Sequence, residues 1–491
     1  MRYLITGAIG YIGGRLAPRL VGRGDVRCLV RDPSKLRDVP WAAEAEIVQG
    51  DLLDPESVRA ACRDVDVVYF LVHSLSDEGF ASLDRKVALL VGQAAREAGV
   101  QRIVYLGGLH PDGPLSEHLS SRAEVGEILL RSGVPTAALQ AAVILGSGSA
   151  SFEMLRYLTE RLPVMLTPSW VHNRIQPIAV RDVLRYLVAA AELPPEVNRT
   201  FDIGGPDVLT YVDMMQRYAA VAKLPRRRVV SVPALTPRLS AHWVNVVTPV
   251  PKGIAAPLIE SLIHEVVCRE QDILEYVPGE CLGYERAVEL ALARITDGEV
   301  ETHWSGAAVA GAPSDPLPSD PDWSGGTVYT DDREQPCTAE PEELWRVVTG
   351  IGGERGWYSF PLAWSVRGWM DRLVGGVGLA RGRRDPDRLH VGDALDWWRV
   401  ETLEDGTLLR LRAEMKVPGL AWLEMGVAPA PGGSRYTQRA VFVPHGLTGH
   451  LYWWCVAPFH GIVFGGMVRN ITRTAERAVP VRAGTAPRRA S

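Results

Sequence analysis

The feature that most constrains this chain is a set of three glycines near its start, placed between an apolar run and a helical pattern. The apolar run covers residues 3–5 and predicts a buried strand. Beyond the glycines, apolar side chains recur at helical spacing, at Ile12, Leu16 and Leu20. The glycines form the pattern G-x-x-G-x-x-G, at Gly7, Gly10 and Gly13. Residues 1–20 therefore predict a strand, a tight turn and a helix.

Each glycine has a separate mechanical role in such a turn. Gly7 makes the tight turn, Gly10 lets the backbone approach a pyrophosphate, and Gly13 lets the helix pack closely on the strand. The helix N-terminus adds free N–H groups and the positive end of its dipole. We therefore predict that the turn binds a dinucleotide, through the residues Gly7, Ile9, Gly10, Tyr11, Ile12 and Gly13.

The end of the next strand, Asp25–Val30, indicates which dinucleotide the turn accepts. A site for NAD places a carboxylate there for the ribose 2′-hydroxyl, whereas a site for NADP places a cation there for the 2′-phosphate. Here the strand is followed by Arg31 and Asp32, with Lys35 and Arg37 close behind. Arginine suits a phosphate because its planar fork donates two parallel hydrogen bonds. We therefore predict NADP(H), while Asp32 keeps NAD(H) as the less favoured alternative.

Further strands and helices alternate along the next part of the chain. Strands are predicted at 46–52, 65–72 and 102–106, and helices at 55–62 and 82–98. The run at 65–72 is almost continuously apolar, as a central parallel strand should be. The alternation predicts the α/β class, a doubly wound parallel sheet of the Rossmann type.

Composition excludes several classes of protein. The 491 residues are too many for one ordinary domain, so two or three are expected. The net charge of −5 does not suggest a nucleic-acid binder, which would need a basic face. The six cysteines lack C-x-x-C spacing, which favours reduced thiols over a zinc site or a disulfide framework. Because no signal peptide precedes the first strand, we expect a cytoplasmic protein.

The glycine turn, Gly50-Asp51-Leu52 and residues 102–107 together resemble the extended and atypical short-chain dehydrogenase/reductase superfamily. Within it, the chain resembles the branch of nitrogen-metabolite-repressor-like proteins and the nucleotide-binding accessory subunit of respiratory complex I. The resemblance covers residues 1–295 and includes 176–183 and 200–205. It implies that Asp51 and Leu52 flank the adenine, that Val72 and His73 lie on the nicotinamide side, and that residues 145–295 form a small substrate lobe.

The chain departs from this superfamily at its catalytic motif. Catalytic members carry Tyr-x-x-x-Lys, in which the tyrosine is the acid or base and the lysine lowers its pKa. The corresponding register here holds His118 and Arg122, and the serine or threonine position falls at Gly107 or Gly108. A histidine can exchange protons near neutral pH, and Arg122 could hold the ribose but cannot titrate. The alternative is that His118 is a surface residue and the site is inactive.

Two further histidines stand on loops at strand ends, where such folds bind substrate. They are His73 and His110. The candidate catalytic set is therefore His118, Arg122, His73 and His110.

The character of the chain changes after residues 301–325, which are rich in Pro, Ser and Asp and predict a linker. The linker separates a first domain, residues 1–300, from a second at 326–478, and residues 479–491 are expected to be a disordered tail. The second domain is expected to contain a helix at 339–348, a long terminal helix and antiparallel strands, at 326–330, 392–401, 408–416, 421–428 and 434–443.

The terminal helix includes an apolar segment, residues 447–468, that is long enough to be compared with a membrane span. The segment contains His450, Pro458 and His460, and its apolar residues follow a helical period. This favours a core helix over a membrane-associated one, and we expect no transmembrane span. One face is expected to pack inward, formed by Leu451, Trp454, Cys455, Phe459, Ile462, Val463, Met467 and Ile471.

The order of elements in the second domain resembles the α+β helix-grip fold of START-like proteins. Such domains enclose an apolar cavity between sheet and helix, so the resemblance implies a hydrophobic ligand. Five tryptophans would line the cavity or pack the core, at positions Trp397, Trp398, Trp422, Trp453 and Trp454. The glycines at 375–378 do not follow a strand and open a helix, so a second phosphate loop is not expected.

These features together predict an NADP(H)-dependent oxidoreductase. Its substrate would be a small apolar carbonyl, enone or quinone-like molecule, with the C-terminal domain holding the apolar ligand. One alternative is a non-catalytic NADP(H) sensor or scaffold. Another is a redox-neutral cyclase or isomerase that retains the nucleotide as structure. The sequence favours no particular oligomeric state.

Overall fold

The computed structural model describes residues 1–478 except 38, 74–78, 112, 114, 233–243, 245–246, 301–326, 353–355, 359–388 and 416. The predicted linker, the predicted tail and the glycines at 375–378 lie outside these described residues. The chain divides into two compact units, Met1–Gly326 and Thr327–Ser491. All six cysteines are free.

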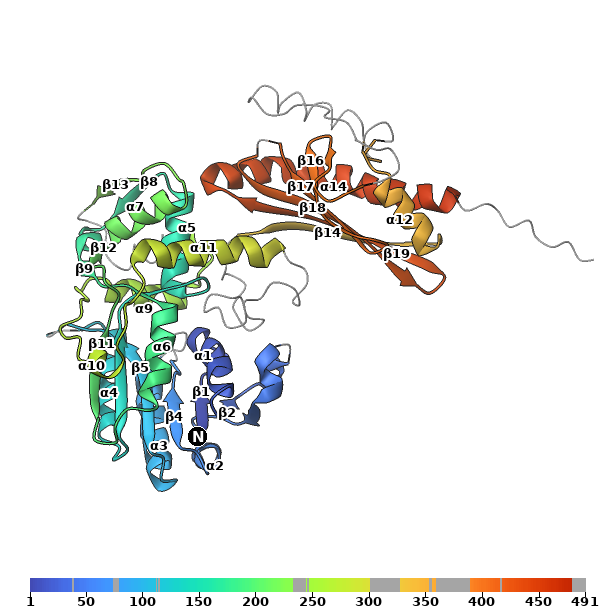
Figure 1. The fold of residues 1–491 in the computed structure, drawn as a ribbon. Helices are drawn as coiled ribbons and strands as arrows, with labels where there is room; N and C mark the ends of the chain where they lie inside the picture. The colour runs from blue at the N-terminus through green and yellow to red at the C-terminus, as the bar shows by residue number, and fades with distance from the viewer. Residues whose placement is uncertain are drawn as a thin grey trace, which may run out of the picture. The chain divides into compact units, whose positions relative to one another are not determined.

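The first unit is built on a seven-stranded sheet in the order β11-β6-β5-β4-β1-β2-β3 (Figure 1). Every neighbouring pair is parallel. The strands are β1 Arg2–Thr6, β2 Asp25–Val30, β3 Glu46–Gln49, β4 Val67–Phe70, β5 Arg102–Gly108, β6 Thr136–Ala141 and β11 Arg199–Ile203. All residues of β4 and β6 are buried because helices cover both faces of the sheet.

The covering helices give the sheet a hydrophobic core on each side. Helices α1 Tyr11–Val21 and α6 Val180–Ala190 pack on one face, and α2 Pro55–Cys62, α3 Phe80–Glu97 and α4 Glu117–Leu130 on the other. The predicted doubly wound parallel sheet is confirmed. The strand order reverses between β1 and β4, and the crevice at such a reversal is where open α/β sheets bind ligands.

Residues 145–295 form most of a smaller lobe, although α6 and β11 within this range belong to the main sheet. The lobe has three short strand pairs, β7 Ile144–Leu145 with β10 Ile178–Ala179, β8 Val164–Thr167 with β13 Arg228–Ser231, and β9 Arg174–Ile175 with β12 Leu209–Thr210. Its helices are α5 Ala150–Arg161, α7 Tyr211–Val221, α9 Lys252–Ser261, α10 Ile273–Tyr276 and α11 Tyr284–Val300. Three 3-10 turns, at Pro33–Leu36, Pro40–Glu44 and Ser169–His172, complete the unit.

The second unit contains a six-stranded antiparallel sheet in the order β14-β19-β18-β17-β16-β15. Its strands are β14 Tyr329–Cys337, β15 Ala394–Leu395, β16 Trp398–Glu404, β17 Leu408–Ala413, β18 Gly419–Ala430 and β19 Gly433–Pro444. Helices α12 Pro341–Thr349 and α14 Gly446–Ala478 contact the sheet and each other. Trp397, Trp398 and Trp422 are buried, which agrees with core packing rather than exposure.

Helix α14 corrects the expected inward face. Its second half is buried through Met467 and Ile471, but Trp454 is 60% exposed and Phe459 is 62% exposed. Trp454 therefore neither lines a cavity nor packs the core.

The physical reason is that the first half of α14 turns another set of side chains, including His450 and Trp453, towards the sheet. His450 is hydrogen-bonded to the Tyr329 hydroxyl at 2.9 Å, and Trp453 stacks on the Tyr329 ring with centroids 4.8 Å apart. Among the described helices, only α14 is long and apolar enough to cross a membrane, and 24% of its most apolar window is buried.

Candidate functional site

The glycine turn has the geometry that its sequence predicts. Gly7 has a φ of +85°, and a Cβ there would lie 2.9 Å from the carbonyl oxygen of Leu71. A Cβ at Gly13 would run into the carbonyl oxygen of Gly7, so α1 packs directly on the turn. A Cβ at Gly10 would meet only the Gly7 oxygen, at 3.2 Å. Beyond that contact the space over Gly10 is open, as a pyrophosphate requires.

The other turn residues lie around this opening. Gly10 is the N-cap of α1 and has no side-chain cap, so the first N–H groups of the helix face the opening. Ile9 packs against the core beneath, together with Ile12. The Tyr11 ring lies under the Arg15 guanidinium at 4.1 Å and faces the turn around Gly148. Tyr11 therefore joins the turn to the smaller lobe.

The end of β2 separates the two candidate recognition groups. Asp32 caps the turn Pro33–Leu36, because its Oδ1 accepts from the backbone N–H of Ser34 at 3.0 Å and from its hydroxyl at 2.6 Å. These hydrogen bonds, the side-chain one first, lower the pKa of the Asp32 carboxyl. Arg31 is exposed and has no ion pair within the described part of the chain. Asp32 is thus engaged locally, whereas the guanidinium beside it is available for an anion.

The predicted adenine and nicotinamide residues follow the neighbouring strands. Asp51 comes after β3, and its Oδ1 accepts from the Leu53 N–H at 2.9 Å, which leaves Leu52 at the apex of the turn. Val72 comes after β4, and its Cγ2 would lie 3.4 Å from a Cβ on Gly7. The carboxyl ends of β4, β1, β2 and β3, neighbours in the sheet, therefore carry the whole predicted nucleotide set.

A pair of buried histidines stands at the same edge of the sheet. His73 follows β4 and His118 lies in α4, and their ring centroids are 5.0 Å apart. His73 Nδ1 lies 2.7 Å from Asp84 Oδ2, and Asp84, in α3, is 4% exposed. His118 Nδ1 lies 2.8 Å from the hydroxyl of Ser261, in α9. The structure thus brings two chain-distant histidines together and gives each a separate anchor.

The hydrogen bonds assign the tautomer of His118. The Ser261 hydroxyl donates its hydrogen to the carbonyl oxygen of Pro257 at 2.9 Å, so its oxygen accepts from His118 Nδ1–H. A carboxylate can only accept, so His73 Nδ1 also carries a hydrogen, which it donates to Asp84. His73 Nε2 is buried and has no hydrogen-bond partner among the described residues.

Burial makes both histidines poor bases. It lowers the pKa of His118 to about 2, with smaller contributions from His73 and Arg122. The alternative that His118 is a surface residue is wrong, because the residue is only 8% exposed. Burial and Arg122 also lower the pKa of His73, against the opposing effect of Asp84. Both rings are neutral near pH 7.

Arg122 and His110 occupy different places. The Arg122 guanidinium donates to the carbonyl oxygen of Leu106 and lies 5.5 Å from the Tyr105 ring centroid, so it rests against β5. His110 follows β5, and its Nε2 lies 3.4 Å from the Gln140 amide nitrogen at the end of β6. Of the four candidate residues, His73, His118 and Arg122 cluster, whereas His110 faces the neighbouring strand.

Comparisons with known proteins agree with this geometry. Residues 7–148 match the family described as NAD(P)H-binding. A reductase from Streptomyces griseus, named for (4-alkanoyl-5-oxo-2,5-dihydrofuran-3-yl)methyl phosphate, is 28% identical over 46% of this chain and 75% of its own length. A 3 beta-hydroxysteroid dehydrogenase/Delta 5-->4-isomerase from Mycobacterium tuberculosis is 29% identical over 40% of this chain and 61% of its own length.

A solved structure of similar fold is the triphenylmethane reductase of Citrobacter sp. It is 20% identical, covers 60% of this chain and all of its own (100%), and has a TM-score of 0.50, which indicates a shared fold. The first unit is therefore a Rossmann-like NAD(P)-binding domain. Residues 323–467 match a family described as a protein of unknown function, DUF2867.

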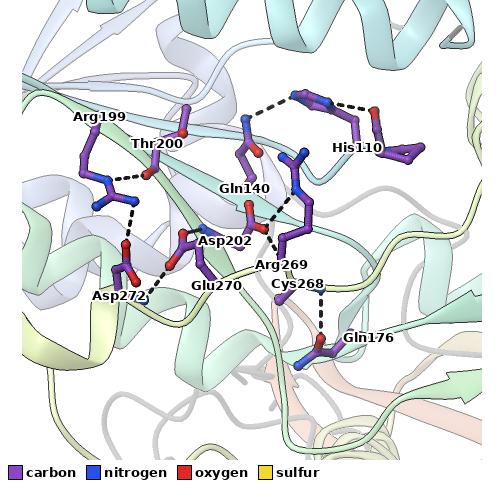
Figure 2. Close-up of polar contacts among 11 residues, drawn as sticks. His110, Gln140, Gln176, Arg199, Thr200, Asp202, Cys268, Arg269, Glu270 and Asp272 are labelled. Carbon is purple, nitrogen blue, oxygen red and sulfur yellow. Dashed lines mark hydrogen bonds and ion pairs between the residues drawn. The ribbon is translucent and has the colours of Figure 1, made fainter. Parts of the chain in front are cut away.

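A polar network joins β11 to residues 269–272, next to the end of β6 (Figure 2). Asp202 Oδ2 accepts from the Arg269 backbone N–H at 2.9 Å, and Glu270 Oε1 accepts from the Asp202 N–H at 2.6 Å. Arg199 pairs with Asp272 at 2.8 Å. These contacts fasten the segment around Arg269 to β11, beside Gln140, which pairs with Asp202 across the strands. His110 lies beside this network through its contact with Gln140.

The sequence reading missed Asp84 and Ser261, the two anchors of the histidine pair. Asp84 could have been noticed in the sequence, because it shares the apolar face of the predicted helix with Val87, Ala88 and Val91. A charge at such a position needs a partner. Nothing in the sequence pointed to Ser261, since 143 residues separate it from His118.

Proposed function

We propose that this protein is an NADP(H)-dependent reductase of small apolar molecules with a carbonyl, enone or quinone-like acceptor. The observation that carries the proposal is the position of the His73–His118 pair. The pair lies at the carboxyl end of β4, next to the glycine turn after β1, where the Rossmann strand order reverses. Hydride donor and proton-exchanging groups would therefore meet at one edge of the sheet.

The nucleotide would be held by the open backbone at Gly10 and by the uncapped N-terminus of α1. The engagement of Asp32 with Ser34 favours NADP(H) over NAD(H), because Arg31 is then the group available at the adenosine ribose. When bound, the nicotinamide supplies a hydride. Asp51 and Leu52 would limit the adenine pocket, and Val72 would lie beneath the nicotinamide.

The residues around the acceptor favour conjugated substrates. Neither a tyrosine nor a lysine stands at the usual register, and both histidines are neutral near pH 7. Proton transfer by a placed side chain typically contributes 10²–10⁴-fold, so simple ketones should react slowly. Enones and quinones spread the charge that arrives with the hydride, so they depend less on an immediate proton.

The C-terminal domain would hold the apolar ligand, as its START-like arrangement of sheet and long helix suggests. Native mass spectrometry of the full chain purified from its host would test this part. A stoichiometric apolar compound bound to the chain would support it. A chain that carries no such compound and gains none from an apolar library would contradict it.

The decisive experiment is anaerobic oxidation of NADPH by the purified chain with a panel of quinones, enones and simple ketones. We expect turnover with the conjugated acceptors and little with the ketones. Tight NADPH binding without any oxidation would favour the sensor or scaffold. Conversion of a β,γ-unsaturated to an α,β-unsaturated ketone without NADPH consumption would favour the isomerase.

A further inference from the structure

The two histidines of the buried pair differ in what their Nδ1 atoms face. His73 faces a buried carboxylate, that of Asp84, at 2.7 Å. His118 faces a hydroxyl, that of Ser261, whose single hydrogen is already given to Pro257. A carboxylate stabilises an imidazolium at that distance, whereas a neutral hydroxyl does so weakly. Only one ring of the pair therefore has a counter-ion for a second proton.

The contact with Asp84 also determines which nitrogen of His73 can accept or donate the exchanged proton. Because Nδ1–H is held by Asp84, the lone pair lies on Nε2. That atom has no partner among the described residues, although it is buried. A buried polar atom without a partner costs free energy, so its retention points to a group that it meets only during function.

We propose that His73, and not His118, is the residue that exchanges the proton with the substrate, and that Asp84 is its positioning residue. This inference rests on the proposed reductase function. Asp84 acts through His73: it holds the tautomer with Nε2 free and balances the charge when the ring is doubly protonated. His118, anchored by Ser261, stays neutral and packs beside the reacting ring.

The proton and electron balance is complete with the groups named. NADPH, when bound, would supply the hydride that forms a C–H bond at the acceptor carbon, while the π electrons of the conjugated carbonyl move to its oxygen. The oxygen takes the proton from His73 Nε2, which breaks the N–H bond and leaves the neutral ring. Nε2 then regains a proton from solvent. The substrate is reduced by two electrons and NADPH is oxidised to NADP⁺.

The direction of the pH dependence follows from the charged groups that face His73. Within the part of the chain that the structure describes, these are Asp84 from α3, and Arg122 and His118 from α4. Burial and Arg122 outweigh Asp84, so the pKa of His73 lies below 6.5. The reactive imidazolium is thus a minority form at pH 7. Reduction should accelerate as the pH falls from 8 towards that pKa, about tenfold per pH unit while the proton is limiting.

The first test reads the tautomer directly and needs no turnover. Nitrogen-15 NMR of histidine-labelled full chain, with His73→Gln to assign the signal, should show Nδ1 protonated and Nε2 unprotonated in the wild type at pH 7.5. Asp84→Asn preserves size but offers an amide, so it should remove that preference. Glu97→Gln, at the end of the same helix, should leave the signal unchanged. A protonated Nε2 in the wild type would overturn the positioning role.

The second test measures turnover. Asp84→Asn should lower kcat for an enone by about 10²-fold, the low end of the range for a placed proton donor, because a conjugated acceptor depends less on an immediate proton. It should also move the pH profile to lower pH, while the Kd for NADPH stays within about twofold. Asp84→Glu, which restores a carboxylate, should recover part of the rate and confirms that loss is not misfolding. A pH profile that survives His73→Asn but disappears in His118→Asn would overturn the proton-transfer role.

The two failures can be told apart. If no acceptor oxidises NADPH, the proposed function fails and the proton-transfer role fails with it. The NMR result then still decides whether Asp84 fixes the His73 tautomer.

Discussion

The glycine turn offers a matched pair of substitutions whose effects should separate nucleotide binding from folding. Gly10→Val places a branched side chain where the protein leaves open space, because a Cβ there meets only the Gly7 carbonyl oxygen at 3.2 Å. The backbone at Gly10 has φ −75° and ψ 165°, which valine adopts without strain. Gly13→Ala, in contrast, places a Cβ against the carbonyl of Gly7.

The expected magnitudes follow from these contacts. At Gly10 the fold should lose about 1 kcal/mol, the typical cost of replacing a favourable N-cap residue by an apolar one. The valine would, however, keep the pyrophosphate from the N–H groups of α1. Each hydrogen bond to a charged group contributes about 1.5–3 kcal/mol, so losing two weakens binding by about 100-fold or more. At Gly13 the helix must move, which costs about 1–3 kcal/mol of folding free energy.

Isothermal titration with NADPH and with NADH, together with thermal unfolding, measures both effects. Gly10→Val should keep its unfolding temperature within a few degrees and bind neither nucleotide measurably. Gly13→Ala should unfold at a clearly lower temperature. Unchanged NADPH affinity in Gly10→Val would refute the reasoning, because the phosphates would then lie elsewhere. An unfolded Gly10→Val would refute the claim that the space over this residue is open.

Three further predictions follow from single sites. Arg31→Ala should weaken NADPH binding by about 1.5–3 kcal/mol and leave NADH binding nearly unchanged in the same titration, and equal losses would contradict the NADP assignment. Glu153→Leu should destabilise the first unit by about 3–5 kcal/mol in urea unfolding, because it strands the buried Arg156 charge with which Glu153 pairs; a loss below about 1 kcal/mol would show that solvent reaches Arg156. Trp454→Ser and Phe459→Ser should each change the unfolding free energy by no more than about 0.5 kcal/mol, since both side chains are exposed; a large loss would restore them to the core.

The local geometry of the candidate nucleotide site could be predicted because each of its parts is local in sequence. Gly7 takes a left-handed conformation that glycine adopts at no steric cost, and Gly13 stands where no Cβ fits. The apolar runs before and after them predicted strands and helices by their period alone. Arg31 could be assigned to the position after the second strand because it directly follows the apolar run that predicts that strand. Only the hydrogen bonds between Asp32 and Ser34 could not be predicted, because a carboxylate two residues before a serine can point either towards that serine or towards the ribose.

The candidate catalytic residues were predicted as a set without their geometry. His73 was predicted from its position at a strand end and His118 from the motif register, but nothing in the sequence indicated that their rings lie 5.0 Å apart. His110 shared the same signal and lies against Gln140 instead. The sequence pattern predicts at which edge of the sheet a histidine lies. Which residues contact that histidine depends on how α3, α4 and α9 pack over the edge.

What the sequence by itself determined is therefore the doubly wound sheet, the glycine turn and the class of cofactor, because short-range sterics and periodicity decide them. The tertiary structure decided the rest. In the structure, His450 and Trp453 of α14 face the sheet while Trp454 is exposed. Both faces of this part of the helix are apolar, and the contacts with Tyr329 and Phe442 determine which of them packs inward. The tertiary structure also gave His73 a buried carboxylate and His118 only a hydroxyl, through contacts that fold distant segments together. The charge a histidine can carry depends on those contacts, so the chemistry of the pair is a property of the packing.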